Sequence, residues 1–222
     1  MNKCALYTSG HNIKYFDVTV PYMLEYCKVH NIDFILRQQQ HLPNYSPSIP
    51  AAFERFNIYN LLDVYDRVVW VDADILIKKS APNIFDIVPE DKFGVYYESD
   101  DVARGHFISL LPQLYNYTGV NRYLNSGVFV ASKMHKEMFN MERVKQFLNR
   151  PNVEPGMNVD QDYLNIIIHR DKIQTYSLGY KFNCLVNITN SKLLKLAYFY
   201  HFAGAWNKNI FMKKFLLHYP CN

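Results

Sequence analysis

Short apolar runs alternate with amphipathic segments along the chain, and this alternation predicts the order of strands and helices. A run that is apolar throughout is typical of a strand buried on both faces, whereas apolar residues three or four apart are typical of a helix packed on one side. The runs that predict strands cover residues 3–10, 32–37, 67–74, 92–99, 126–132, 172–178 and 196–204. The segments that predict helices cover residues 18–29, 51–65, 132–150 and 159–170.

Strands that alternate with helices predict an α/β protein with a mostly parallel central sheet flanked by helices. The 222 residues suffice for one large core, and no Gly/Ser- or Pro-rich linker divides them, so we expect a single domain over residues 1–222. The sequence is also compatible with one domain of a longer protein. In a parallel sheet, ligands bind beyond the carboxyl ends of the strands, where polar residues follow apolar runs.

The composition is that of an ordinary globular protein, with 49% hydrophobic and 20% charged residues. Its four cysteines are scattered and none forms a C-x-x-C pair, so neither a zinc site nor a disulfide framework is expected. The N-terminus lacks the apolar stretch of a signal peptide, and no segment approaches the length of a membrane span. We therefore expect a cytoplasmic protein.

The charge of the chain is uneven. Residues 172–222 contain seven Lys and no Asp or Glu, so the rest of the chain carries −3 of the net charge of +4. One interpretation is an anionic partner, which could be a phosphate group, a nucleic acid or a lipid surface; the other is a set of solvated lysines. Apolar and basic residues mix at helical spacing in residues 207–219, which makes peripheral membrane contact a hypothesis for this segment. No nucleic-acid-binding motif accompanies the lysines, so a nucleic-acid partner is not expected.

Two carboxylates, Asp72 and Asp74, end the apolar run of the strand predicted over residues 67–74. Positions i and i+2 of a strand share a face, so the two side chains can converge, and an uncompensated pair of buried charges is strongly disfavoured. A divalent cation, Mn²⁺ or Mg²⁺, removes this repulsion and also binds phosphates. The alternative is a pair of acids in a surface turn or at a helix N-terminus. The apolar residues on both sides favour the metal site.

A histidine, His201, follows a second apolar run near the C-terminus. Such a residue is usually packed in a core, but an imidazole beside two carboxylates is a good third ligand for Mn²⁺. Gly204 would let the backbone approach a phosphate, and Lys208 could reach phosphate oxygens as a point charge.

Two further polar motifs stand at predicted element boundaries. Asn125, Ser126 and Gly127 precede or begin a strand, either as a ligand-binding turn or as a plain strand-initiating turn. Residues 160–162, Asp-Gln-Asp, stand at a helix start, where one Asp would suffice for capping. Because Asp160 and Asp162 cannot share a helical face, we expect at most one of them to accompany Gln161 at a site.

In their order, these motifs resemble those of GT-A fold glycosyltransferases, most closely the retaining families 8 (glycogenin-like and bacterial galactosyltransferase-like) and 34. The series spans most of the chain, and its order is more specific than any single motif. It consists of the first strand, a helix with an Arg, D-x-D at residues 72–74, N-S-G at residues 125–127, D-Q-D at residues 160–162 and H-x-x-G at residues 201–204. The resemblance implies a single-domain GT-A fold with a nucleotide-binding part over residues 1–100 and an acceptor part over residues 101–222.

The resemblance also implies a role for each motif. It makes Asp72, Asp74 and His201 the ligands of Mn²⁺, which would hold the diphosphate of a nucleotide sugar, by default a UDP-sugar. It makes Asp160 and Gln161 the catalytic residues beside the anomeric carbon. It places Tyr7, Thr8 and Ser9 at the base and ribose of the donor, and Arg55 and Ala73 beside the D-x-D acids. It places Asn125, Ser126 and either Asp100 or Asp101 at the donor sugar. Gly204 and Lys208 would contact the phosphates. The family usually places Lys six residues after the His; here that position is Asn207, and Lys208 follows it.

The implied reaction is transfer of a sugar from a nucleoside diphosphate to a glycan or protein-linked acceptor. We expect retention by front-face attack, and the alternative is a double displacement with Asp160 as nucleophile. Two other classes stay open: a sugar nucleotidyltransferase, which would normally carry a Gly-rich basic loop near the N-terminus, and a non-catalytic carbohydrate-binding domain. The intact D-A-D, D-Q-D and His201 argue against the second of these.

Overall fold

The structure, a computed structural model, describes residues 2–39, 52–101, 106–149 and 158–221. Its strands are β1 (Cys4–Ser9), β2 (Asp33–Arg37), β3 (Arg67–Val71), β4 (Ile75–Ile77), β5 (Phe93–Tyr97), β6 (Leu124–Ser132), β7 (Thr175–Ser177), β8 (Cys184–Leu185) and β9 (Phe199–His201). Its α-helices are α1 (Phe16–His30), α2 (Ile58–Leu61), α3 (Ile84–Ile87), α4 (Glu98–Asp101), α5 (His106–Tyr115), α6 (Met141–Leu148), α7 (Val159–Arg170), α8 (Ser191–Leu196) and α9 (Lys208–His218). The 3₁₀ segments are η1 (Ala52–Asn57), η2 (Lys133–Phe139) and η3 (Tyr180–Phe182).

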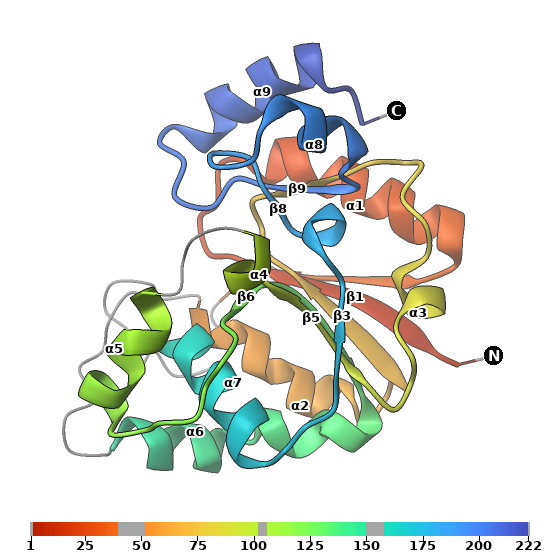
Figure 1. Cartoon of the computed structure of the whole chain (residues 1–222). Coiled ribbons are helices and arrows are strands. Elements are labelled where there is room, and N and C mark those ends of the chain that lie inside the picture. The colour runs from red at the N-terminus through yellow and green to blue at the C-terminus, as the bar shows by residue number, and fades with distance from the viewer. Residues whose placement is uncertain (1, 40–51, 102–105, 150–157, 222) are drawn as a thin grey trace.

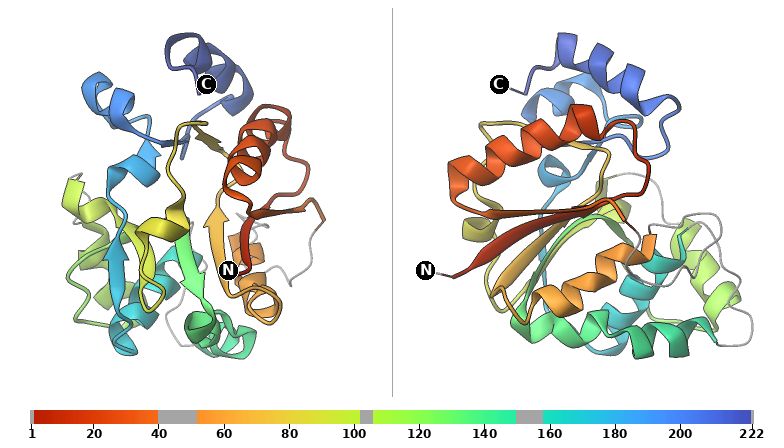
Figure 2. Two further views of the ribbon diagram at one scale, coloured as in Figure 1. Left: turned by 90° about the vertical axis from the view of Figure 1, so that its right-hand side faces the viewer. Right: turned by 180° about the vertical axis from the view of Figure 1, so that it is seen from behind.

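A six-stranded sheet with the order β2-β1-β3-β6-β5-β7 forms the centre of the molecule. β1 pairs in parallel with β2 and β3, and β5 pairs in parallel with β7, whereas β6 runs antiparallel to β3 and β5. The helix α1 lies over one face of this sheet, and α2, α6 and α7 lie over the other (Figure 1 and Figure 2). The predicted α/β fold with a mostly parallel central sheet is therefore confirmed.

Burial on both faces explains the apolar run of β3. Val68 and Trp70 belong to the core shared with α2 and α7, and Val69 and Val71 belong to the core shared with α1 and α3. The two pairs alternate because successive side chains of a strand point to opposite faces of the sheet. All residues of β3 are buried, as the unbroken apolar sequence predicts.

A second, three-stranded sheet has the order β4-β9-β8. Ile75 of β4 is the register partner of His201 of β9, so this small sheet carries the C-terminal part of the chain to the end of β3. Tyr200 of β9 packs with Met212 and Phe215 of α9 in a third core. None of the helices in the described ranges is long and apolar enough to cross a membrane.

Two predicted helices differ from the observed ones. The helix predicted over residues 132–150 is replaced, over Lys133–Leu148, by η2 and α6, which are separated at Asn140. The side chain of Asn140 accepts a hydrogen bond from the backbone N of Glu142 and so starts a new helix. In the helix predicted over residues 51–65, Ala52–Asn57 form the 3₁₀ segment η1, and the described part is α-helical only over Ile58–Leu61.

Candidate active site

The carboxyl ends of β1 and β3 and the start of β6 meet at one edge of the central sheet. β1 and β3 are parallel and end together, while β6 is antiparallel to β3 and begins where β3 ends. Val71 pairs with Val128, and the N–H of Asp72 donates to the carbonyl oxygen of Gly127 at 2.8 Å. This topology brings the N-S-G motif beside the D-A-D motif, although the two are far apart in the sequence.

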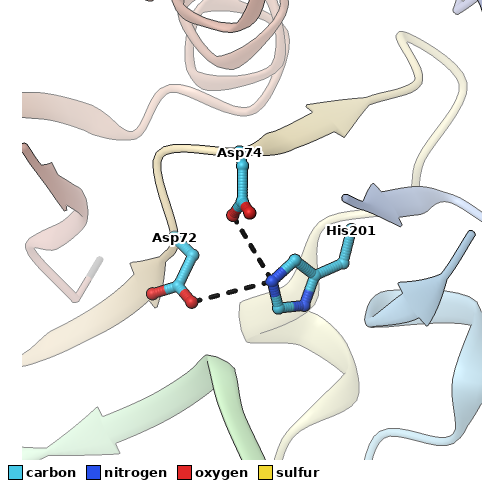
Figure 3. A group of neighbouring side chains, drawn as sticks. All are labelled: Asp72, Asp74 and His201. Carbon is cyan, nitrogen blue, oxygen red and sulfur yellow. Dashed lines mark ion pairs between the residues drawn. The ribbon is translucent and has the colours of Figure 1, made fainter. Parts of the chain in front are cut away.

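Asp72, Asp74 and His201 form a compact cluster (Figure 3). One ligand atom from each residue lies within 4.8 Å of the other two. His201 Nε2 is 3.3 Å from Asp74 Oδ1 and 3.7 Å from Asp72 Oδ2. Two carboxylate oxygens and an imidazole nitrogen are the donors that a Mn²⁺ ion accepts, so the residues present fit a divalent metal.

The other oxygen of each carboxylate is held by donors of the chain itself. Arg55 Nη2 and Trp70 Nε1 donate to Asp72 Oδ1 at 3.1 and 2.7 Å. Lys208 Nζ donates to Asp74 Oδ2 at 2.5 Å. Each carboxylate therefore has one anchored oxygen and turns the other toward His201.

The charges in the cluster support one another. Burial disfavours the charged form of His201, but attraction by Asp74 and Asp72 outweighs it and raises the pKa of His201 above its usual value. Burial also disfavours ionised Asp74, but His201 and Lys208 outweigh this effect and lower the pKa of Asp74. The cluster is thus built to keep a buried carboxylate negative by placing positive charge beside it.

The cluster lies in a pocket of about 390 Å³ that also contains the D-Q-D and N-S-G motifs. Asp160 Oδ2 pairs with Arg55 Nη1 at 2.9 Å, and burial raises the pKa of Asp160 although Arg55 opposes the shift. Gln161 Oε1 accepts hydrogen bonds from the N–H and the hydroxyl of Ser126 at 2.9 and 3.1 Å. Further residues at the pocket wall are Ala52, Asn125, Gly127, Asn158, Ala203, Gly204 and Lys208.

Asp162 lies away from this pocket, as its helical position predicts. Its carboxylate accepts hydrogen bonds from the hydroxyls of Tyr115 and Tyr123 at 2.6 and 2.5 Å, in a buried position. Of the two acids in D-Q-D, Asp160 alone lines the pocket with Gln161.

Lys208 reaches the cluster despite its shifted place in the sequence. Asn207, just before α9, has a left-handed backbone with φ 48°. Lys208 is the first residue of α9, and its side chain extends to Asp74. Lys208 lies one residue beyond the position where the family usually has its Lys. The left-handed turn at Asn207 precedes it, and its ammonium group still lies beside the predicted metal ligands.

Some residues implied by the resemblance lie outside this pocket. Tyr7 is buried at the end of β1, where its hydroxyl donates to the carbonyl oxygen of Glu54 at 3.0 Å. Thr8 and Ser9 are also buried, and Ala73 accepts a hydrogen bond from Thr19 through its carbonyl oxygen. Asp101 ends α4, but its side chain lies outside what the structure describes. The roles of these residues stay predictions.

Three residues beside the site had no signal in the sequence motifs. Trp70 anchors Asp72, as described above. Asn183 Oδ1 lies 2.7 Å from His201 Nδ1, and Glu98 Oε2 accepts a hydrogen bond from Asn125 at 3.1 Å. Glu98 thus contacts the N-S-G motif through Asn125, whereas Asp100 pairs with Arg122 at the surface. A buried Glu directly after the apolar run of β5 is the one local pattern that could have indicated this role.

Solved structures of glycosyltransferases share this fold. A glycosyltransferase involved in the glycosylation of the major capsid of PBCV-1 matches with a TM-score of 0.63 at 17% identity, over 95% of this chain and 99% of that chain. The galactosyltransferase LgtC, in complex with donor and acceptor sugar analogs, matches with a TM-score of 0.59 at 12% identity, over 95% and 94% of the two chains. The apo-form glycosyltransferase GlyE of Streptococcus pneumoniae TIGR4 matches with a TM-score of 0.59 at 14% identity, over 98% and 60%.

The chain belongs to glycosyl transferase family 8, because the sequence profile of that family matches residues 7–220. A search of curated protein sequences gave no match. The GT-A fold and the family 8 membership expected from the motifs are therefore confirmed, and the protein is a glycosyltransferase.

Proposed function

We propose that this glycosyltransferase moves a sugar from a nucleoside-diphosphate sugar, with UDP as the expected nucleotide, to a hydroxyl group of a glycan or protein-linked acceptor. We further propose that it depends on a divalent metal and retains the anomeric configuration. The observation that carries the proposal is that residues from D-A-D, N-S-G, D-Q-D and H-x-x-G line one pocket. That pocket places a metal-type donor set beside polar groups suited to a sugar.

Asp72, Asp74 and His201 would hold the metal, with Mn²⁺ favoured by the imidazole and Mg²⁺ as the alternative. When bound, such an ion stabilises the negative charge that develops on a departing diphosphate. Lys208 and Arg55 add fixed positive charge to the same pocket. In a partly buried site these groups attract an anionic donor more strongly than the same groups would in water.

The nucleoside is expected at the carboxyl ends of β1 and β2, next to the predicted Tyr7, Thr8 and Ser9. A second hollow of about 510 Å³ is present there, lined by Gly10, Asn12, Ile13, Lys14, Phe16 and Gln38. Tyr15, next to Phe16 in the chain, is contacted by Lys208 at 5.6 Å from its ring centre. Lys208 at the wall of the first pocket thus lies over the ring of Tyr15, whose chain neighbour Phe16 lines the second hollow, which supports a ligand that extends from one to the other.

The contacts of Asp160 favour front-face attack over a double displacement. Asp160 is buried and paired with Arg55, and a carboxylate in such a pair is a weak nucleophile. In front-face attack the bond between the anomeric carbon and the diphosphate oxygen breaks, and the acceptor oxygen bonds to the same carbon. The acceptor proton then passes to the departing diphosphate. Asp160 and Gln161 would contact the sugar hydroxyls and support an oxocarbenium-like transition state.

A panel of nucleotide sugars tests this proposal directly. We expect UDP-sugars, compared with GDP- and CMP-sugars, to raise the melting temperature of the chain in the presence of Mn²⁺ and to be turned over slowly to free nucleoside diphosphate. Asp72→Ala or Asp74→Ala should abolish the Mn²⁺-dependent turnover and leave the fold intact, as judged by circular dichroism. The control is Asp63→Ala, because Asp63 is an exposed acid paired with Lys136, remote from the pocket. Full Mn²⁺-dependent turnover in either cluster variant would refute the metal assignment.

The same panel separates the two alternative functions. A sugar nucleotidyltransferase would consume a nucleoside triphosphate and a sugar phosphate and release pyrophosphate. A carbohydrate-binding domain would be stabilised by free sugar alone and would release no nucleotide.

Peripheral membrane contact through the basic C-terminal segment stays a separate prediction. In α9, Met212 and Phe215 are buried in the core, while Lys213, Lys214 and Leu217 are exposed. Salt-sensitive binding of the whole chain to liposomes that contain anionic lipid would support the contact, and absence of binding would exclude it.

A further inference from the structure

A line of buried polar side chains runs from His201 into the interior of the protein. His201 Nδ1 lies 2.7 Å from Asn183 Oδ1, and Asn183 Nδ2 donates to Asn125 Oδ1 at 2.9 Å. Asn125 Nδ2 in turn donates to Glu98 Oε2 at 3.1 Å. All four side chains are buried, with Asn183 and Glu98 at 0% exposure. Buried polar groups joined in one network hold each other in a single arrangement.

The direction of every hydrogen bond in this line is fixed by a backbone donor. The N–H of Gly127 donates to Asn125 Oδ1 at 2.9 Å, so Asn125 turns its oxygen to Gly127 and its amide nitrogen to Glu98. The same oxygen faces Asn183, which must therefore donate from Nδ2 and turn Oδ1 to His201. Because an amide oxygen can only accept, His201 Nδ1 must carry a proton, so Nδ1 is the protonated nitrogen of the neutral ring.

The proton on Nδ1 determines which interactions the other imidazole nitrogen, Nε2, can make. A neutral ring that carries its proton on Nδ1 has a lone pair on Nε2. Nε2 is the atom that faces Asp72 Oδ2 and Asp74 Oδ1. The line of amides is thus directed so that a neutral His201 can be a metal ligand on the side of the carboxylates, which have no proton to donate to Nε2.

We propose that Asn183 is a positioning residue of the metal site, which holds His201 in the Nδ1–H tautomer and aims its Nε2 lone pair between Asp72 and Asp74. The inference rests on the proposed function, since the partner of Nε2 is the proposed divalent ion. A ligating His commonly donates its other N–H to a fixed acceptor, and loss of that acceptor lowers metal affinity about 10- to 100-fold.

The first measurement is calorimetric titration of the full chain with Mn²⁺ alone. Asn183→Ala should lower the affinity about 10- to 100-fold, and Asn183→Asp, which keeps an acceptor for the Nδ1 proton, should restore most of it. The matched control is Asn165→Ala. Asn165 is similarly buried, but among the described residues its side chain bonds to backbone groups of Leu124 and Gln161, so this variant should lose stability and keep its Mn²⁺ affinity.

The second measurement needs no metal. Imidazole ¹⁵N spectra report which ring nitrogen carries the proton, and the signal of His201, one of eight His, is assigned by its loss in His201→Asn. At a pH above the imidazole pKa, the wild type should show the proton on Nδ1, and Asn183→Ala should show a mixture of tautomers. A purely packing role of Asn183 would lower the melting temperature without changing the tautomer.

The outcomes separate this proposal from the one it rests on. Equal Mn²⁺ affinity in wild type and Asn183→Ala, or a wild-type His201 with its proton on Nε2, would overturn the positioning role alone. A wild type that binds no Mn²⁺ while His201 is in the Nδ1–H tautomer would overturn the metal site, and with it the ligand assigned to Nε2.

Discussion

At position 127 the chain has no space for a side chain. A Cβ atom on Gly127 would lie 2.3 Å from Cε1 and 2.7 Å from Nδ1 of His201, and 3.0 Å from Asn125 Oδ1. The His201 ring packs directly against the backbone of β6, so the glycine is needed for clearance rather than for a special backbone angle. This contact links the N-S-G motif to the H-x-x-G motif by direct packing.

We therefore predict that Gly127→Ala displaces His201 and lowers Mn²⁺ affinity by about tenfold or more, because the imidazole can no longer face both carboxylates. Calorimetric titration with Mn²⁺ checks this. Gly94→Ala is the control, since a Cβ there would meet side-chain atoms of Val88 and Val130, away from the pocket. It should reduce stability and leave Mn²⁺ affinity unaltered, and a similar loss of affinity in both variants would contradict the prediction.

Lys208 is the second residue whose position leads to a prediction. Its ammonium group binds Oδ2 of Asp74, the carboxylate whose other oxygen is proposed to bind the metal, and its positive charge repels the ion. In Lys208→Met we expect Mn²⁺ alone to bind at least as tightly as in the wild type. A nucleoside diphosphate should bind about tenfold more weakly, because a charge-assisted hydrogen bond is lost. Lys214→Met, an exposed lysine of the same helix, is the control for both titrations. Weaker Mn²⁺ binding with unaltered nucleotide binding in Lys208→Met would contradict this prediction, because it would show that Lys208 supports the metal and not the nucleotide.

Among the elements, η2 contains a titratable group that is remote from the site. Ser132 and His135 form a capping box at its start, in which the N–H of Ser132 donates to His135 Nδ1 at 3.0 Å. Nδ1 must therefore be unprotonated. Burial and the positive charge of Arg67 together lower the pKa of His135 from 6.5 to about 4, although Asp91 opposes the shift. The Phe93 ring, 5.5 Å away, adds an apolar neighbour.

The sign of the resulting pH effect follows from these pKa values. Between pH 6.5 and about 4, His135 is protonated in the unfolded chain but neutral in the folded chain. The free energy of unfolding therefore falls as the pH is lowered through this range. The shift corresponds to roughly 3 kcal/mol at most. Urea unfolding of wild type and His135→Gln at a series of pH values measures the difference. We expect the variant to be less stable near neutral pH but to lose less stability on acidification; parallel curves would disprove the effect.

How far each element could be predicted from the sequence depended on the kind of signal that forms it. β3, β6 and α7 are set by apolar periodicity, which is local, and they were predicted. The break at Asn140 depends on a single side-chain cap that competes with a continuous amphipathic pattern. β8 and α8 are short and gain their stability from the third core, so the sequence around them carries little periodic signal. The antiparallel direction of β6 is a property of pairing, which no local pattern specifies.

The same distinction applies to the candidate site. Asp72, Asp74, Asp160 and His201 stand in motifs, and the structure brings them into one pocket. Asn183 stands in a segment without a motif, and its importance appears only when β8 and β9 are placed beside β6. Glu98 shows the same limit, because its contact with Asn125 depends on where β5 ends. Residues that position other side chains are therefore harder to predict from the sequence than residues that would contact the ligand themselves.

Over the whole molecule, the proposed metal would join the two sheets. Asp72 follows β3 of the central sheet, while His201 ends β9 of the small sheet. The N–H of Phe202 donates to the carbonyl oxygen of Asp74 at 3.1 Å, and the N–H of Val186 donates to the carbonyl oxygen of His201 at 3.0 Å. Both backbone hydrogen bonds would become harder to open when an ion bridges the side chains of the same residues.

We therefore predict that Mn²⁺ slows amide hydrogen exchange most strongly at Val186 and Phe202, and little in β2 at the far edge of the central sheet. A Mn²⁺ concentration of about 100 times the dissociation constant should add about 2.7 kcal/mol to the free energy of unfolding. Exchange followed by mass spectrometry with and without Mn²⁺ gives the pattern, and His201→Asn is the control that should lose the local protection. Slowing that is uniform along the chain would reflect the rise in global stability alone and would contradict the predicted local effect at Val186 and Phe202. Slowing that is confined to the two strands beside His201 would show that the ion holds the C-terminal part of the chain against the end of β3.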